Sequence, residues 1–284
     1  MKIAVSGASG FTGSALVREL VRREHEVIKI SRDSFTLPPD EFTAKKIEGT
    51  DAIVHLAGSP IIRRWTVKGK REITDSRILT TRRIVEAIAQ ATVKPKVLIS
   101  ASAIGIYDSQ NTHTEESRDF SDGFLSRVCR DWETETLKAE GLIRTVILRL
   151  GVVIGDGGMV ARLRFPFSVG LGGTIGNGRQ HFSFIHIDDL IAIILACMEN
   201  TEMSGIYNAV APWPTDNGHF TEVLGKVLMQ PAIFRIPAFA LKLMYGEAAV
   251  VLTEGQRVLP ERLMQLNFPY KYPTIEKALL RTLR

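Results

Sequence analysis

A glycine-rich turn near the start of this 284-residue chain constrains its fold more than any other feature. The apolar run at residues 2–5 leads into Gly7, Gly10 and Gly13, which have the spacing G-x-x-G-x-x-G. An amphipathic stretch at residues 14–23 follows, with apolar and charged residues on opposite helical faces. The pattern predicts a strand, a tight turn and a helix. Because glycines allow close approach to the backbone and a helix N-terminus offers free N–H groups, this turn suits a pyrophosphate.

The end of the second predicted strand, residues 26–30, indicates which dinucleotide the turn would hold. An NAD site usually has Asp or Glu about 20 residues beyond the glycines, where it accepts hydrogen bonds from the ribose hydroxyls. This chain has Ser31 and Arg32 there. A carboxylate would repel a 2′-phosphate, whereas a guanidinium and a hydroxyl bind one. We therefore predict NADP(H) as the cofactor. The alternative is that Arg32 is an ordinary solvated loop residue.

Strand and helix patterns alternate along the first half of the chain. Apolar runs at 52–58, 97–102 and 145–150 alternate with helical patterns at 67–91 and 122–140. Strands that are apolar on both faces predict an α/β fold with a Rossmann-like, doubly wound parallel sheet. The short segment 33–50 has room for one small further strand, expected at Phe35-Thr36-Leu37.

Glycines and prolines become frequent after residue 150, which predicts a change of organisation. We expect residues 1–150 to form the nucleotide-binding core and residues 151–284 a smaller α/β substrate lobe, with some strands and helices returning to the core. Ligands of such sheets bind beyond the carboxyl ends of the strands. Gly7, Ser31, Ala57 and Ser102 all lie at predicted strand ends, so the site is expected along that edge.

Charge and cysteine content limit the classes of partner. The net charge is +5, and basic residues are concentrated between residues 60 and 96, which favours an anionic small molecule or simply a solvated helix face. Aromatic residues are not interleaved with these charges, so no nucleic-acid partner is expected. The two cysteines, Cys129 and Cys197, form neither a disulfide framework nor a zinc motif, and we predict no metal site.

The apolar stretches are short. The longest, at residues 190–198, is too short to span a bilayer, so no membrane association is expected. The first predicted strand begins at Lys2, which leaves no room for a signal peptide. These features predict a cytoplasmic protein.

Several motifs together resemble the extended short-chain dehydrogenase/reductase superfamily. They are the glycine turn, Leu56-Ala57-Gly58, Ser100-Ala101-Ser102 followed by Gly105-Ile106-Tyr107, Leu148-Arg149-Leu150-Gly151, and the run from Phe184 to Leu190. Within it the chain is similar, almost from end to end, to the atypical branch called the epimerase family with a C-terminal domain of unknown function. Further matches are Arg64-Trp65, the stretch from Phe165 to Gln180, and the run from Glu254 to Pro260. The resemblance implies an NADP-binding Rossmann-like core and little about the substrate.

The chain departs from the superfamily at its usual proton-transfer pair. Its members usually carry Tyr-x-x-x-Lys on the helix after the serine strand. The Tyr exchanges a proton with the substrate, and the Lys lowers the Tyr pKa and holds the nicotinamide ribose. None of the five tyrosines here has Lys four residues later. The corresponding positions on the helix are Leu125 and Cys129, so the standard chemistry is in doubt.

Three side chains are candidate substitutes for this pair. Tyr107 follows Ser102 by five residues, so both hydroxyls are predicted to meet one substrate oxygen, with Tyr107 either positioning the substrate or transferring the proton. Cys129 is a candidate thiol acid or nucleophile, although a buried helical Cys more often serves packing. His186 can titrate near neutral pH, but a structural His is the favoured interpretation, with Asp188-Asp189 capping the helix that follows.

The remaining predicted nucleotide contacts lie in three places: Gly7, Gly10, Phe11, Thr12 and Gly13 in the turn; Leu56, Ala57 and Gly58 after the third strand; and Glu72 and Arg77 on the next helix. Arg77 lies on the stripe of that helix that faces the sheet, where a cation needs a partner. In the superfamily this helix passes the cofactor, so Arg77 and Glu72 are expected to contact NADP. The alternative is an internal ion pair.

Two main hypotheses about function remain open; a third, true sugar-nucleotide epimerisation, is implied by the superfamily resemblance alone and is weaker, because tightly held NAD and the Tyr/Lys pair normally accompany it. The favoured one is an NADP(H)-dependent oxidoreductase or epimerase-like enzyme that acts on a small polar substrate. The other is a non-catalytic NADP-binding sensor or scaffold, which the missing Tyr-x-x-x-Lys supports. Dimerisation through helices that flank the sheet is common in the superfamily, so a homodimer is a further hypothesis.

Overall fold

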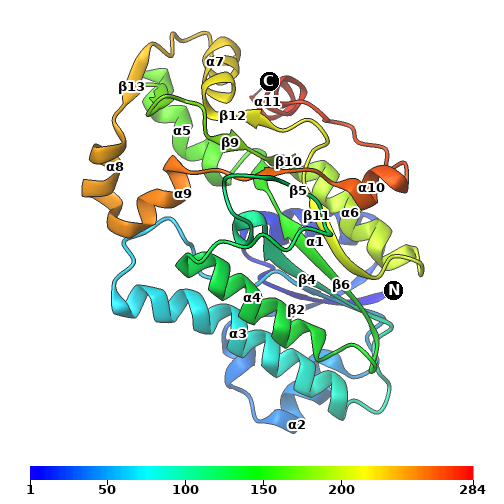
Figure 1. Cartoon of the computed structure of the whole chain (residues 1–284). Coiled ribbons are helices and arrows are strands. Elements are labelled where there is room, and N and C mark those ends of the chain that lie inside the picture. The colour runs from blue at the N-terminus through cyan, green and yellow to red at the C-terminus, as the bar shows by residue number, and fades with distance from the viewer. Residues whose placement is uncertain (284) are drawn as a thin grey trace.

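The computed structural model describes residues 1–283, and a six-stranded parallel sheet forms its centre (Figure 1). The strand order is β11-β6-β4-β3-β1-β2. The bounds are β1 Lys2–Ser6, β2 Glu26–Ile30, β3 Ala52–His55, β4 Val97–Ala103, β6 Arg144–Leu150 and β11 Gly205–Ala209. Strands apolar on both faces need cover on both sides, and the predicted Rossmann-like α/β fold is confirmed.

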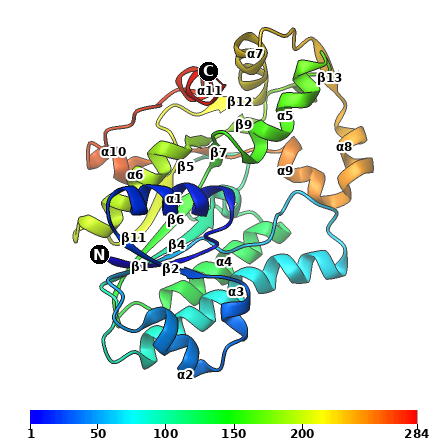
Figure 2. The same cartoon turned by 180° about the vertical axis from the view of Figure 1, so that it is seen from behind.

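Helices cover both faces of this sheet, as the two opposite views show (Figures 1 and 2). Helices α1 (Phe11–Arg22) and α6 (Ile187–Glu199) bury their apolar stripes against one set of strand residues, for example Ile3 and Val5. Helix α3 (Val67–Gln90) packs on the other face, against alternate residues such as Ala4, and is joined there by α4 (Phe124–Leu137). The side-chain alternation of a strand therefore feeds two separate cores.

The segment between β2 and β3 is helical, so the strand predicted at Phe35-Thr36-Leu37 is wrong. A 3-10 turn, η1 (Asp33–Thr36), is followed by α2 (Pro39–Phe42) and the helical turn η2 (Thr43–Ile47). Phe42 and Ile47 are fully buried in the core beneath α3. The consecutive prolines at 38 and 39 suit a helix start better than a central strand. The sheet therefore ends at β2.

The rest of the chain forms a smaller α/β region beside the carboxyl edge of the sheet (Figure 1). It pairs short strands far apart in sequence: β7 with β10, β8 with β13, β9 with β12, and β5 with β14. Helix α6 and strand β11 follow residue 150 but belong to the main sheet layer. No helix among residues 1–283 is long and apolar enough to cross a membrane.

The remaining elements, in chain order, are η3 Ile104–Ile106, β5 Thr112–His113, β7 Val152–Ile154, α5 Gly158–Ser168, β8 Gly173–Ile175, β9 His181–Phe182, β10 Phe184–His186, β12 Thr215–Asp216, α7 Asn217–Val227, β13 Phe234–Ile236, α8 Ala238–Tyr245, η4 Gly246–Ala249, α9 Val250–Thr253, β14 Arg257–Val258, α10 Glu261–Gln265 and α11 Ile275–Leu283.

The loop after β3 contacts the smaller α/β region through Arg64, whose Nε donates to the Met244 carbonyl of α8 at 3.0 Å.

Candidate functional site

The glycine turn between β1 and α1 leaves the N-terminus of α1 free. Gly7 has a φ of +68°, and a Cβ there would lie 2.7 Å from the carbonyl oxygen of Leu56. A Cβ on Gly13 would lie 2.1 Å from the Gly7 carbonyl oxygen, so the helix packs directly on the turn. The N-cap is Gly10, no side chain caps the helix, and its first turn contains no acidic residue. Free N–H groups and a positive dipole end without a competing carboxylate suit a phosphate.

Phe11 and Thr12 form the first turn of α1, where the sequence predicted nucleotide contacts. The Phe11 ring packs against the glycine-rich loop that leads into α5. A Cβ on Gly157 would lie 2.6 Å from this ring, and one on Gly155 would lie 2.8 Å from it. The α5 loop therefore lies against the start of α1, and the small residues of that loop make room for the aromatic ring.

Arg32 lies at the carboxyl end of β2 with its charge uncompensated. It is exposed, and within residues 1–283 it has neither an ion pair nor a side-chain hydrogen bond. The neighbouring Ser31 is held locally, because its N–H and hydroxyl both meet the Ser34 hydroxyl oxygen, at 3.1 and 3.2 Å. A free guanidinium beside a hydroxyl is an arrangement that can bind a phosphate.

Leu56, Ala57 and Gly58 follow β3, and Gly58 lies against Arg77 of α3. A Cβ on Gly58 would lie 3.0 Å from the guanidinium carbon. Arg77 donates to the carbonyl oxygens of Ile73 (3.0 Å) and Ser59 (3.1 Å), and no carboxylate in the described part of the chain pairs with it. The alternative of an internal ion pair is therefore wrong.

Glu72 occupies a different environment from Arg77. Its carboxylate pairs with Arg63 at 2.7 Å, and both side chains remain partly exposed. Glu72 therefore forms an ion pair with Arg63, which belongs to the loop that precedes α3. A carboxylate with this partner is a poor match for the anionic groups of a dinucleotide.

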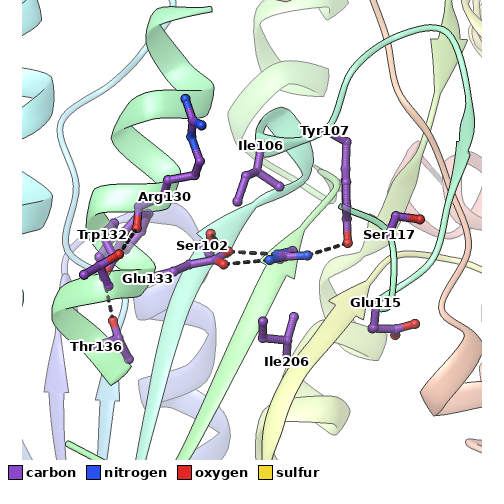
Figure 3. A network of polar contacts seen from close by, with 12 residues as sticks. Ser102, Ile106, Tyr107, Glu115, Ser117, Arg130, Trp132, Glu133, Thr136 and Ile206 are labelled. Carbon is purple, nitrogen blue, oxygen red and sulfur yellow. Dashed lines mark hydrogen bonds and ion pairs between the residues drawn. The ribbon is translucent and has the colours of Figure 1, made fainter. Parts of the chain in front are cut away.

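Ser102 belongs to a buried polar network at the end of β4 (Figure 3). Its hydroxyl donates to Glu133 Oε1 of α4 at 2.6 Å. Glu133 also accepts from Arg149 of β6, Nε to Oε1 at 2.8 Å and Nη2 to Oε2 at 2.7 Å. The strand register explains this grouping, because Ser102, Arg149 and Asn208 of β11 are direct cross-strand neighbours in one row. Glu133 closes the row from the helix above it.

Tyr107 lies at the other end of the same network. Its hydroxyl accepts from Arg149 Nη1 at 2.7 Å and faces two acceptors, Asn208 Oδ1 at 2.9 Å and the Thr114 carbonyl at 3.0 Å. Its ring stacks on His113 with centroids 4.6 Å apart. The side chain is fully buried, and burial raises the pKa of its hydroxyl. A raised pKa and a full set of internal partners do not suit proton transfer.

The prediction that Ser102 and Tyr107 meet one substrate oxygen therefore needs correction. Glu133 and Arg149 stand between the two hydroxyls and bind one each. Neither charged residue was predicted from the sequence as a partner of these hydroxyls. A signal was present, because an arginine inside the apolar strand 144–150 requires a buried acceptor.

The other two substitutes have structural roles. Burial raises the pKa of the Cys129 thiol to about 12, with a further contribution from the Glu133 charge, so thiolate chemistry at neutral pH is not available to it. His186 caps α6, because its Nδ1 accepts from the Asp188 N–H at 3.1 Å, and burial lowers its pKa to about 4. The cap is thus His186 rather than the two carboxylates. Asp189 instead accepts from the N–H groups of Lys271 and Tyr272, both at 2.9 Å.

Comparison with known proteins places these features in a family. The model of the NAD dependent epimerase/dehydratase family matches residues 3–209, and that of a domain of unknown function, DUF1731, matches residues 236–281. The chain is 38% identical to the chloroplastic SDR39U1 homologue of Arabidopsis thaliana, over 98% of this chain and 86% of that protein. It is 36% identical to the epimerase family protein YfhF of Bacillus subtilis, over 98% of this chain and 97% of that protein.

A solved structure agrees with the sequence relatives. The crystal structure of the human epimerase family protein SDR39U1 with NADPH superimposes with a TM-score of 0.92 at 32% identity, covering 100% of this chain and 99% of that chain. UDP-glucuronic acid 4-epimerase of Bacillus cereus shares the fold, with a TM-score of 0.81 at 18% identity, covering 100% of this chain and 98% of that chain. The chain therefore belongs to the NAD dependent epimerase/dehydratase family, in the branch of SDR39U1 and YfhF that carries a C-terminal DUF1731 domain.

Proposed function

We propose that this chain binds NADP(H) and acts as an NADP(H)-dependent oxidoreductase or epimerase-like enzyme on a small polar substrate. One observation carries the cofactor assignment. The uncapped, acid-free N-terminus of α1 lies beside a β2 end that bears the unpaired cation Arg32. A site for NAD would be expected to have a carboxylate in the place of that cation.

The residues present fit the proposed cofactor. Gly7, Gly10 and Gly13 would hold the pyrophosphate, because a Cβ at these positions would crowd the backbone carbonyls of Leu56 or Gly7 and so disturb the turn that presents the helix N-terminus. Ser31 and Arg32 would hold the 2′-phosphate. When bound, the nicotinamide would supply or accept the hydride, while the protein supplies position and polarity. The NADPH in the human relative supports this choice of dinucleotide.

Residues 56–58 extend the proposed binding edge towards β4. Leu56 is held to β1, since its N–H donates to the Ser6 hydroxyl oxygen at 3.2 Å, and its carbonyl lies against Gly7. Ala57 and Gly58 would follow the adenosine-to-ribose side of the dinucleotide. In this proposal Ser102 and Tyr107 are positioning residues, which hold the end of β4 and the loop after it through Glu133 and Arg149.

A second candidate function is a non-catalytic NADP-binding sensor or scaffold. The buried network favours it, because both hydroxyls that the sequence offered for catalysis are used internally. Multiple-turnover oxidation of NADPH with a panel of small carbonyl compounds would support the enzyme. Tight NADPH binding with a change of shape in small-angle scattering, and no turnover with any compound, would support the sensor.

The cofactor proposal is tested by calorimetric titration of NADPH and NADH into the wild-type protein, Arg32→Ala and Arg18→Ala. Arg18 is a matched control, because it is an exposed arginine on the outer face of α1. We expect wild type and Arg18→Ala to prefer NADPH, and Arg32→Ala to lose about tenfold or more in NADPH affinity with little change for NADH. A preference for NADH, or equal NADPH affinity in both variants, would refute the 2′-phosphate assignment.

A further inference from the structure

Arg77 is a partly buried cation to which the residues that the structure describes give no counter-ion. Its Nη1 faces the Ile73 carbonyl and the Ser76 hydroxyl, and its Nη2 faces the Ser59 carbonyl. A guanidinium has five N–H donors, so three contacts leave two donors without a protein acceptor among residues 1–283. Burial lowers the pKa of Arg77, which indicates that the protein itself does not compensate the charge fully. An anionic or oxygen-rich ligand would accept hydrogen bonds from these two donors and compensate the charge.

The position of Arg77 defines which part of a dinucleotide it would reach. In the sheet, β1 lies between β2 and β3, and β4 follows β3. The phosphate-binding turn lies at the end of β1, and Arg32 lies at the end of β2. Arg77 lies against Gly58, beyond β3, and its guanidinium stacks over Trp132 of α4, with 5.4 Å from Cζ to the ring centroid. Arg32 and Arg77 are therefore on opposite sides of the turn.

Helix α4 carries arginines at positions 127 and 130 but has no cation at position 129 itself. Cys129 precedes Trp132 by one helical turn and takes the place where the superfamily usually has the lysine. The Arg77 charge acts on this thiol, since it opposes the rise in the Cys129 pKa. Positive charge thus acts on position 129 from Arg77 of α3 and from Arg149 of β6, although that position itself carries none.

We propose that Arg77 binds the nicotinamide-side ribose and its adjacent phosphate, and so supplies from α3 a cation that position 129 of α4 does not supply. This assignment rests on the proposed function and deepens it. The two remaining N–H donors would face ribose hydroxyl and phosphate oxygens, and Gly58 leaves room for the guanidinium, which would lie 3.0 Å from a Cβ at that position.

The test compares two ligands that share the adenosine half. NADPH contains the nicotinamide ribose, whereas adenosine 2′,5′-bisphosphate carries the 2′-phosphate and lacks the nicotinamide half. We expect Arg77→Met to weaken NADPH binding by about tenfold or more, and to leave the Kd for the bisphosphate within about twofold of wild type. Arg71→Met is the control, because Arg71 lies on the same helix with its side chain 82% exposed. It is expected to change neither Kd.

A further variant tests whether it is the positive charge of Arg77 that binds the cofactor, by moving a cation from position 77 to position 129. The double variant Arg77→Met/Cys129→Lys is expected to recover NADPH affinity relative to Arg77→Met, and Arg77→Lys is expected to keep more affinity than Arg77→Met. Thermal unfolding of each variant identifies those that do not fold, and Arg77→Lys then decides between charge and packing.

Two results separate the proposal from the function on which it rests. If wild type binds both ligands and Arg77→Met weakens both equally or neither, the Arg77 assignment is overturned and the cofactor assignment stands. The Arg77 assignment is also overturned if Arg77→Lys binds NADPH no better than Arg77→Met. If wild type binds neither ligand, the proposed function itself fails.

Discussion

Replacement of Arg149 by Met is the sharpest perturbation of the buried network in Figure 3. Arg149 is 2% exposed and Glu133 6% exposed, and their bidentate contact has distances of 2.8 and 2.7 Å. Methionine fills similar space but leaves the Glu133 carboxylate buried with the Ser102 hydroxyl as its remaining side-chain donor. Breaking a buried ion pair by removing one partner costs about 3–5 kcal/mol, because the other charge is left uncompensated. We expect a loss of that size in the free energy of unfolding.

Equilibrium unfolding in urea measures this loss, and two further variants interpret it. In Arg149→Met/Glu133→Gln the buried charge is gone, so the double variant should be more stable than the sum of the single losses predicts, by about 0.5–3 kcal/mol. Arg82→Met is the control. It breaks the 2.7 Å contact between Arg82 and Glu135, and because Arg82 is 48% exposed, water screens this pair and its loss should cost little. A loss in Arg149→Met no greater than that in Arg82→Met would refute the account of the network.

Three other residues give separate predictions. Burial and the Arg77 charge lower the pKa of His55 to about 3 from 6.5, so the unfolded state binds its proton first as pH falls. Stability should therefore be intact above pH 6.5 and fall by about 2 kcal/mol at pH 5, and unfolding curves of His55→Gln should lack this contribution; an unchanged pH dependence would contradict it. Gly13→Ala should weaken NADPH binding by about tenfold or more, because its Cβ meets the Gly7 carbonyl, whereas Gly105→Ala, with open space, should bind normally in the same titration. Cys129 should resist an aromatic disulfide reagent at pH 8 until denaturant is added, and rapid labelling of the native protein would show that the thiol is accessible.

Features that depend on neighbouring residues in the chain were predictable from the sequence. The glycine spacing at residues 7–13, the helix at 67–90 and the apolar strands were found with bounds close to those in the structure, because hydrophobic period and turn chemistry are local. The exposed cation at Arg32 follows from the same local pattern. The strand expected at residues 35–37 failed, because tertiary packing of Phe42 and Ile47 under α3 outweighed a weak local preference.

The partners of the polar side chains were decided by the tertiary structure. Ser102, Arg149 and Asn208 meet because three strands pair in one register, and Glu133 meets them because α4 crosses above that row. Arg77 lacks a carboxylate because the two acidic residues that precede it on α3, at positions 72 and 75, pair with Arg63 and Arg71 instead. Hydrogen bonds and ion pairs are short-range, so their formation depends on ångström-scale distances between segments far apart in sequence. The sequence alone determined the scaffold and its glycine turn, whereas the packing decided which hydroxyls are engaged internally and left Arg77 without a carboxylate partner.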